Sequence, residues 1–202
     1  ITWYQNLSEK FIRKFSIYFN NKCWDHISIK QKLSEKIIIE FENNLNWNHI
    51  SSCQYLSSEF IEKFKDKINW LSISCKTNML NEKLIRNNKD KIDFVCWGRI
   101  SSYQTLNNNF IIEFKDYLDW NSISKYQKLS ESFIIKFIDI MSFYNIFKYQ
   151  NINFSKKFLL NYLNNEEIKY SNYIKLKIFF INKYYIYKLG DIGLIINNYL
   201  KY

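Results

Sequence analysis

The stretch Trp47–Phe64, WNHISSCQYLSSEFIEKF, returns in pattern at Trp120–Phe137 as WNSISKYQKLSESFIIKF. A third clear copy begins at Trp24, and weaker copies begin at Trp70 and Trp97. The shared phrase is WxxISxxQxLSExFIxxF, and its glutamine recurs at Gln5, Gln31, Gln54, Gln104, Gln127 and Gln150. A phrase that returns at a near-constant period indicates a repeat architecture.

The leucine that opens the LSE part of the phrase marks the period. It falls at Leu7, Leu33, Leu56, Leu80, Leu106 and Leu129, with Phe154 as an aromatic substitute. The two longest steps each hold three extra residues just before a Trp, at Asn21–Cys23 and at Val95, Cys96 and a neighbour. Insertions that gather at one point of a repeat are typical of a loop, so we expect a loop there.

Each copy is predicted to form two helices. The residue after the leading leucine is a helix N-cap type in every copy: Ser8, Ser34, Ser57, Asn81, Asn107, Ser130 and Ser155. The apolar residues that follow, such as Phe60, Ile61, Phe64 and Ile68, have helical spacing, which predicts a long helix with one buried face. The WxxISxxQ part follows capping residues at Asn46, Asn69, Asp119 and Ser142 and predicts a shorter helix of about two turns.

One such hairpin buries too little apolar surface to offset the entropy of ordering its residues, so neighbouring copies must stack. We therefore predict an all-α fold: an α-solenoid of about seven stacked αα-hairpin repeats, with a period of about 23 residues, over residues 1–162. Residues 163–202 are predicted to be a diverged C-terminal cap, with helices at 173–188 and 191–201, packed into the same domain. Ile1 and Thr2 occupy the Ile-Ser positions of a copy without its Trp, which suggests that a longer protein continues upstream.

The recurring large and polar side chains have a structural interpretation. The tryptophans share a helical face with Ile and Leu, which favours a core role over a base-stacking platform for Trp24, Trp47, Trp70, Trp97 and Trp120. A glutamine on that buried face needs a partner, so we expect Gln31, Gln54, Gln104, Gln127 and Gln150 each to bond a neighbouring backbone group at a hairpin turn. A ladder of glutamines that reads a ligand would require variation at these positions.

Composition limits the functional classes. The chain has 202 residues, no Ala, no Pro and a single Val, and it favours residues with A/T-rich codons. Its net charge of +10 comes almost entirely from Lys, since Arg13, Arg86 and Arg99 are its only arginines. Lysines scattered over the whole chain favour solvated helix faces over a specific nucleic-acid site. No apolar run is long enough for a membrane span, and no signal-peptide pattern is visible.

The cysteines and histidines offer one candidate metal set. Cys23 and His26 form CxxH and His49 and Cys53 form HxxxC in successive copies, so these four could ligate zinc. Both histidines, however, lie two residues after a Trp, so the spacing follows from the repeat, and we expect no metal or cofactor. Four cysteines without a CxxC pair fit a reducing, intracellular compartment. With two histidines and no phosphate-binding loop or nucleophile motif, the sequence predicts no enzyme.

The segments Trp47–Ile61 and Trp120–Ile134 resemble repeat proteins of unknown function from giant DNA viruses of amoebae, the mimivirus-like group. The resemblance covers roughly residues 1–162; it implies a location in a virion or in the cytoplasm of an infected host and transfers no functional residue. The leading hypothesis is a non-enzymatic scaffold that binds another protein through a groove or edge of the solenoid. Two alternatives are a Lys-rich nucleic-acid-binding module and an F-box-like ubiquitin-ligase adaptor, which the short LSE…F…W phrases suggest.

Overall fold

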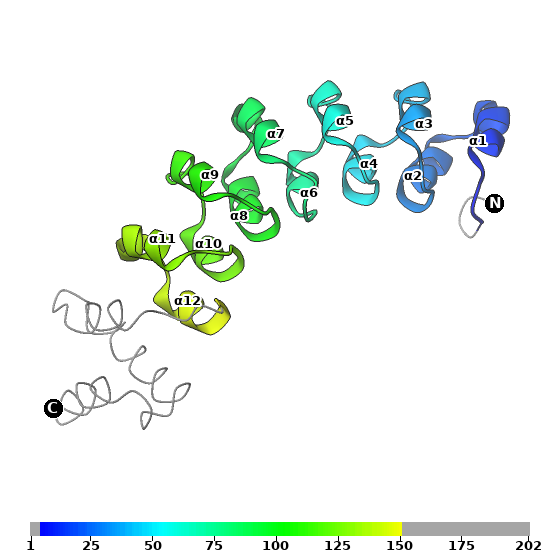
Figure 1. The fold of residues 1–202 in the computed structure, drawn as a ribbon. Coiled ribbons are helices and arrows are strands. Elements are labelled where there is room, and N and C mark those ends of the chain that lie inside the picture. Colours follow the sequence, from blue (N-terminus) through cyan, green and yellow to red (C-terminus); the bar gives the residue numbers. More distant parts are fainter. Residues whose placement is uncertain (1–4, 151–202) are drawn as a thin grey trace, which may run out of the picture. The chain divides into compact units, whose positions relative to one another are not determined.

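The computed structural model describes residues 5–150, and this part of the chain is all-helical (Figure 1). It contains twelve α-helices and three short 3-10 helices, with no strand among residues 5–150, which confirms the predicted all-α class. The chain divides into two compact units, Ile1–Leu118 and Asp119–Tyr202. The predicted cap at 163–202, its helices and the repeat positions Phe154 and Ser155 lie outside the described residues.

One set of helices, the LSE helices, begins at the predicted caps. In the first unit they are α1 (Glu9–Phe15), α3 (Glu35–Glu40), α5 (Ser58–Lys63), α7 (Glu82–Asn87) and α9 (Asn108–Glu113), and in the second unit α11 (Glu131–Lys136). The side chain of each preceding Ser or Asn accepts a hydrogen bond from the backbone N–H three residues on, as Ser57 does from Phe60 at 3.1 Å. All six predicted caps within the described residues are therefore confirmed.

The second set, the Trp helices, alternates with the first. Its members are α2 (Asn21–Lys30), α4 (Trp47–Cys53), α6 (Trp70–Ser74) and α8 (Phe94–Tyr103) in the first unit, and α10 (Trp120–Tyr126) and α12 (Phe143–Tyr149) in the second. The predicted caps Asn46, Asn69, Asp119 and Ser142 each accept a hydrogen bond from the first turn of their helix and are confirmed.

The LSE helices are shorter than predicted, so the expected contrast between a long and a short helix was wrong. α5 ends at Lys63, with Phe64 as its C-cap, and the backbone N–H groups of Lys67 and Ile68 both donate to the Phe64 carbonyl in a turn. Ile68 is still buried, because the turn returns it to the same apolar face. After α1, α7 and α11 a short 3-10 helix follows the LSE helix instead: η1 (Ser16–Tyr18), η2 (Lys89–Lys91) and η3 (Ile138–Ile140).

The two three-residue insertions extend helices, so the expected loops were wrong too. They form the first turns of α2 and α8, which are ten residues long, and the Trp of each phrase lies inside its helix. Asn20 and Asp93 cap these turns by accepting from the backbone N–H groups of Cys23 at 3.0 Å and Cys96 at 2.8 Å. Three residues are close to one helical turn, so the insertion lengthens the helix and keeps the buried face in register.

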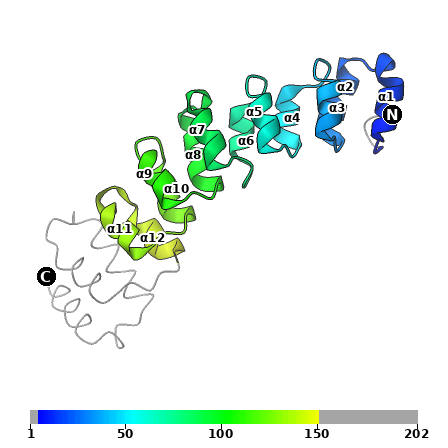
Figure 2. The ribbon, with the colours of Figure 1, turned by 45° about the horizontal axis from the view of Figure 1, so that its top comes forward.

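In the first unit the two sets of helices lie in two rows, with the LSE helices in one and the Trp helices in the other (Figures 1 and 2). Successive Trp helices pack on each other, α2 on α4, α4 on α6 and α6 on α8. In the second unit α10 packs on α12. Each of these helices from α2 to α10 buries the isoleucine of its Ile-Ser pair completely. These residues are Ile27, Ile50, Ile73, Ile100 and Ile123.

Candidate interaction surfaces

The recurring glutamines hold the backbone of the preceding copy. Gln54 Nε2 donates to the carbonyls of Gln31 at 2.8 Å and Ser28 at 3.0 Å, and Gln54 Oε1 accepts from the Leu33 N–H at 3.1 Å. Likewise, Gln31 Nε2 donates to the Gln5 carbonyl at 2.9 Å, and Gln31 Oε1 accepts from the Leu7 N–H at 2.8 Å. In the second unit Gln150 donates to the Gln127 carbonyl at 2.6 Å. We call four glutamines that form such bonds, Gln31, Gln54, Gln104 and Gln150, the glutamine ladder; Gln31, Gln54 and Gln104 are buried, and Gln150 is half-buried.

Lys76 takes the place of the glutamine that the Trp70 copy lacks. Its Nζ donates to the Gln54 carbonyl at 2.5 Å, and its own carbonyl accepts from Gln104 Nε2 at 2.9 Å. The turn around it contains Asn78 at a φ of 59°, a left-handed conformation that Asn adopts more readily than most residues. Burial lowers the pKa of the Lys76 ammonium, because the charged form loses hydration there.

Serine and glutamate of the phrase also bond the adjacent copy, which sequence reasoning missed. Ser28 Oγ donates to the Trp24 carbonyl within its own helix and accepts from the Asn46 N–H of the next copy at 3.1 Å. Glu9 Oε1 accepts from the Ser34 N–H at 2.9 Å, and this bond with Ser34 lowers the pKa of Glu9. The same pairs recur as Ser51 with Asn69, Ser124 with Ser142, Glu35 with Ser57 and Glu82 with Asn107. The only signal in the sequence was their recurrence.

The tryptophans combine packing with one hydrogen bond. Trp24, Trp70 and Trp97 are buried, and Trp47 and Trp120 are half-buried. The indole N–H groups of Trp47 and Trp70 donate to the carbonyls of Glu42 at 2.9 Å and Lys65 at 3.0 Å, in the turns that follow α3 and α5. Four of the rings pack on a phenylalanine at the end of the next LSE helix: Trp24 on Phe41, Trp47 on Phe64, Trp97 on Phe114 and Trp120 on Phe137.

Asn88 occupies the position of that phenylalanine in the copy after Trp70. It is almost completely buried, and its Nδ2 donates to Glu62 Oε2 at 2.8 Å and to the Leu84 carbonyl at 3.0 Å. Its Oδ1 is buried without a hydrogen-bond partner among the residues that the structure describes. A buried acceptor without a partner destabilises the fold, so Asn88 lowers the stability of this copy relative to a phenylalanine at the same position.

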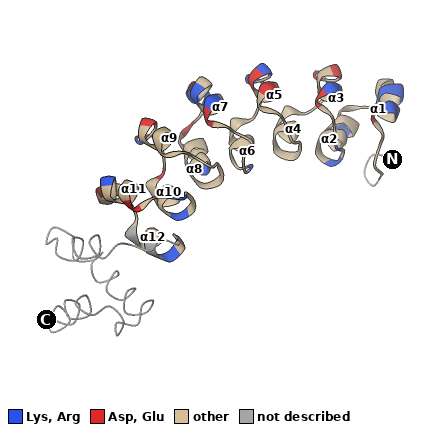
Figure 3. Ribbon diagram, viewed as in Figure 1, with Lys and Arg blue, Asp and Glu red and all other residues tan. Residues whose placement is uncertain are grey.

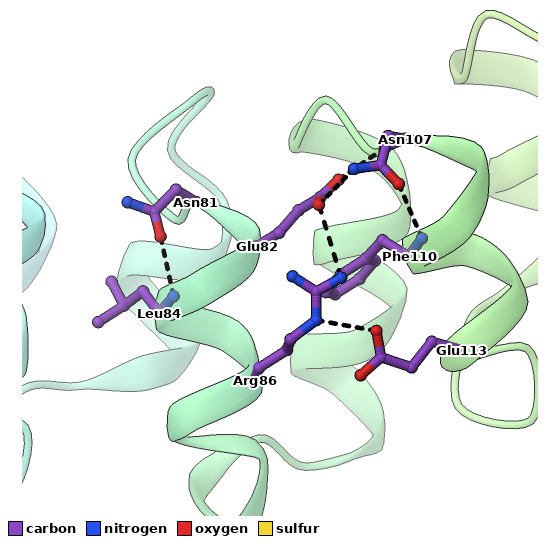
Figure 4. Close-up of polar contacts among 7 residues, drawn as sticks. All are labelled: Asn81, Glu82, Leu84, Arg86, Asn107, Phe110 and Glu113. Carbon is purple, nitrogen blue, oxygen red and sulfur yellow. Dashed lines mark hydrogen bonds and ion pairs between the residues drawn. The ribbon is translucent and has the colours of Figure 1, made fainter.

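Charged side chains of the first unit pair with one another on the LSE helices. Figure 4 shows Arg86 of α7 between two carboxylates, with its Nε 2.8 Å from Glu113 Oε2 and its Nη2 3.7 Å from Glu82 Oε2. Its guanidinium lies 5.0 Å from the centre of the Phe110 ring, and Glu82 also accepts from Asn107. Further pairs that join successive copies are Arg13–Glu40, Lys67–Glu42 and Lys91–Asp66.

Two open hollows border α7, one of about 500 Å³ beside Arg86 and Thr105 and one of about 470 Å³ beside Glu62 and Lys63. Charged and polar side chains supply most of their lining, and Arg86 and Glu62 already have partners in the chain. Small-molecule sites are typically enclosed and mainly apolar. These hollows therefore do not identify a ligand.

Three of the Trp helices in the first unit contain almost no charged residues, although the exposed Asp93 caps α8 directly before Phe94. α4 and α6 contain no Lys, Arg, Asp or Glu, and α8 contains only Arg99, whose Nη1 donates to the Leu71 carbonyl at 2.6 Å. Figure 3 shows this contrast with the LSE helices, which carry most of the charge. The exposed apolar side chains here are Leu71 of α6 and Phe94, Val95 and Tyr103 of α8, and we call these four the neutral surface.

The candidate zinc residues do not form a metal centre within residues 5–150, where no three His, Cys, Asp or Glu side chains are placed so that they could hold a metal ion. Cys53 is exposed, whereas Cys23, His26 and His49 are half-buried. Cys96 in α8 is not one of these candidates, and burial raises the pKa of its thiol to about 11. None of the helices in the described part of the chain combines the length and apolarity that crossing a bilayer requires.

Comparison of the chain with protein-family models, curated proteins and solved structures finds no match. The functional interpretation therefore depends on the residues themselves.

Proposed function

We propose that this protein is a non-enzymatic scaffold, an α-solenoid of about seven hairpin repeats that binds another protein. The bonds of the repeated phrase support the stacked arrangement: Gln54, Ser28 and Glu9 each bond the backbone of an adjacent copy. Because the glutamine, serine and glutamate of the phrase form these bonds in several copies, we assign them to maintaining the fold. Recognition then falls to positions that differ between copies, as is usual on the surfaces of repeat proteins.

The neutral surface is the observation that carries the proposal. Cores of protein–protein interfaces are depleted of charge and enriched in aromatic side chains. Phe94 is 88% exposed, with Val95 beside it, on the turn that the insertion adds to α8. Leaving such apolar side chains in water costs free energy that a partner would recover. Paired charges on the LSE helices make that row a weaker candidate for a partner.

The phrase resembles repeat proteins of giant DNA viruses, which supports a role in a virion or in the cytoplasm of an infected host. The four cysteines within the described residues are all free, as a reducing compartment favours.

The test compares two variants of the full chain as baits in extracts of the native source. One is F94D with V95D on the neutral surface. The control is I17D with Y18D, a comparably exposed apolar pair in η1. We expect a protein partner, identified by mass spectrometry, that wild type and the control retain and F94D/V95D loses, while both variants keep the helical circular dichroism of wild type. Equal retention by both variants, or no retained protein with wild type, would overturn the proposal.

A further inference from the structure

Two lysines and three tyrosines cluster on the packed helices α10 and α12 of the second unit. Lys125 Nζ lies 4.6 Å from the centre of the Tyr126 ring and 4.7 Å from that of Tyr149. Lys148 Nζ lies 5.2 Å from the same Tyr149 ring and 2.8 Å from the hydroxyl oxygen of Tyr144. The three rings are about half exposed. We call these five residues the Tyr–Lys cluster.

The positive charge of the cluster is not compensated within the described residues. Neither α10 nor α12 contains Asp or Glu, and no carboxylate of residues 5–150 forms an ion pair with Lys125 or Lys148. The two ammonium groups nevertheless share one ring, Tyr149, although like charges repel. An anionic ligand would relieve that repulsion.

The cluster is also specific to these two copies. Lys125 and Tyr126 directly precede Gln127, and Lys148 and Tyr149 directly precede Gln150, so the two pairs occupy equivalent positions of the phrase. In the four Trp copies of the first unit the same two positions hold Ile29–Lys30, Ser52–Cys53, Cys75–Lys76 and Ser102–Tyr103. A fold-maintaining role would not require Lys–Tyr at these positions, since the other copies fold without it.

We infer that the Tyr–Lys cluster binds single-stranded nucleic acid, with phosphates at the two ammonium groups and bases stacked on the exposed tyrosine rings. Proteins that bind single strands without sequence preference combine these elements, cationic side chains for the backbone and aromatic rings for the bases. An acidic peptide would use the lysines but leave three half-exposed rings without a role. A duplex keeps its bases stacked internally and could not use the rings either.

Lysine rather than arginine in the cluster indicates binding that is tolerant of sequence. The ammonium is a point charge that neutralises phosphate without the planar fork that reads guanine. This activity is separate from the proposed scaffold, because the neutral surface belongs to residues 5–118 and the cluster to residues 119–150. Either can fail without the other.

The experiment measures fluorescence anisotropy of labelled oligouridylate and oligothymidylate of about 15 nucleotides with the full chain at several salt concentrations. We expect binding that weakens as salt rises. K125Q/K148Q should lower the slope of log affinity against log salt by about 1.4, since each phosphate contact with a single strand contributes about 0.7. Y126S/Y149S should weaken binding about tenfold or more and leave that slope unchanged, because stacking releases no counterions.

The matched control is K32Q/K128Q, which removes the same charge from the exposed residues that follow Gln31 and Gln127. It should bind like wild type. The inference is overturned if wild type does not bind the single strands, if the cluster variants bind as wild type does, if a duplex binds equally well, or if a glutamate-rich peptide binds better than the oligonucleotides.

Discussion

The side-chain amide of Gln54 lies against the backbone of Gln31, with its Nε2 2.8 Å from the Gln31 carbonyl oxygen. These glutamines occupy the same position in successive copies, so one copy's side chain holds the extended segment that ends the preceding Trp helix. The Gln31 N–H still donates to the Ile27 carbonyl, but the Gln31 carbonyl and the Leu33 N–H depend on the neighbour's Gln54. The stability of each copy is thereby coupled to the next.

Gln54→Met should lower the free energy of unfolding by about 2–4 kcal/mol, as expected when buried polar groups lose their partner. Methionine keeps the volume but leaves the Leu33 N–H and the Gln31 carbonyl without the amide. Urea unfolding followed by circular dichroism measures the change. Gln5→Met is the control, because that side chain is exposed, and it should leave the midpoint unchanged. Equal effects of the two substitutions would refute a specific role of the ladder.

The sequence was sufficient for features that depend on local spacing. A cap such as Ser57 acts within its own first turn, and the buried face of α5 follows from Phe60 and Ile61, so both could be predicted. The end of α5 at Lys63 could not, because the turn that follows brings Ile68 back to the same apolar face. A continuing apolar period therefore did not distinguish a helix from a helix followed by a turn.

The bonds that glutamate side chains form with the next copy were beyond sequence reasoning. Glu9 beside a cap residue reads as an ordinary first-turn carboxylate, yet it accepts from Ser34 in the next copy. Recognising this requires the distance between stacked helices, which no local pattern contains. The same holds for the Tyr–Lys cluster: Lys125 and Tyr149 belong to different copies, and only the packing of α10 on α12 brings them together.

Asn88→Phe should raise the free energy of unfolding by about 1–3 kcal/mol. The substitution restores the aromatic residue that the other copies place against their Trp, and it removes the buried Oδ1 that has no partner in the described structure. Thermal and urea unfolding both report it. The reciprocal change, Phe64→Asn, should destabilise the protein by about 3 kcal/mol or more, since it removes a buried ring. A destabilised Asn88→Phe would mean that the copy has no room for the ring.

Cysteine alkylation should separate Cys53 from Cys96. The thiolate is the reactive form, and Cys96 is buried with its pKa raised to about 11, whereas Cys53 is exposed. At about pH 8, where an ordinary cysteine is partly ionised, iodoacetamide should modify Cys53 at least tenfold faster in the native protein. In urea the two rates should converge. Peptide mass spectrometry at timed intervals measures both sites, and comparable native rates would contradict the burial of Cys96.

Glu9→Gln should reduce stability in a pH-dependent way. The folded-state pKa of Glu9 is lowered, chiefly by its hydrogen bond with Ser34, so the ionised carboxylate stabilises the fold above the unfolded-state pKa. That contribution is lost as pH falls through the lower folded-state pKa. The difference in unfolding free energy between wild type and Glu9→Gln should therefore be present at pH 7 and vanish well below pH 4.5, the ordinary value of the group. Glu59→Gln provides the control, because Glu59 is an exposed carboxylate in the first turn of α5 that forms no bond with the next copy in the described structure. Its difference should stay small throughout. A Glu9 difference that persists at low pH would show that the side chain acts through packing rather than through its charge.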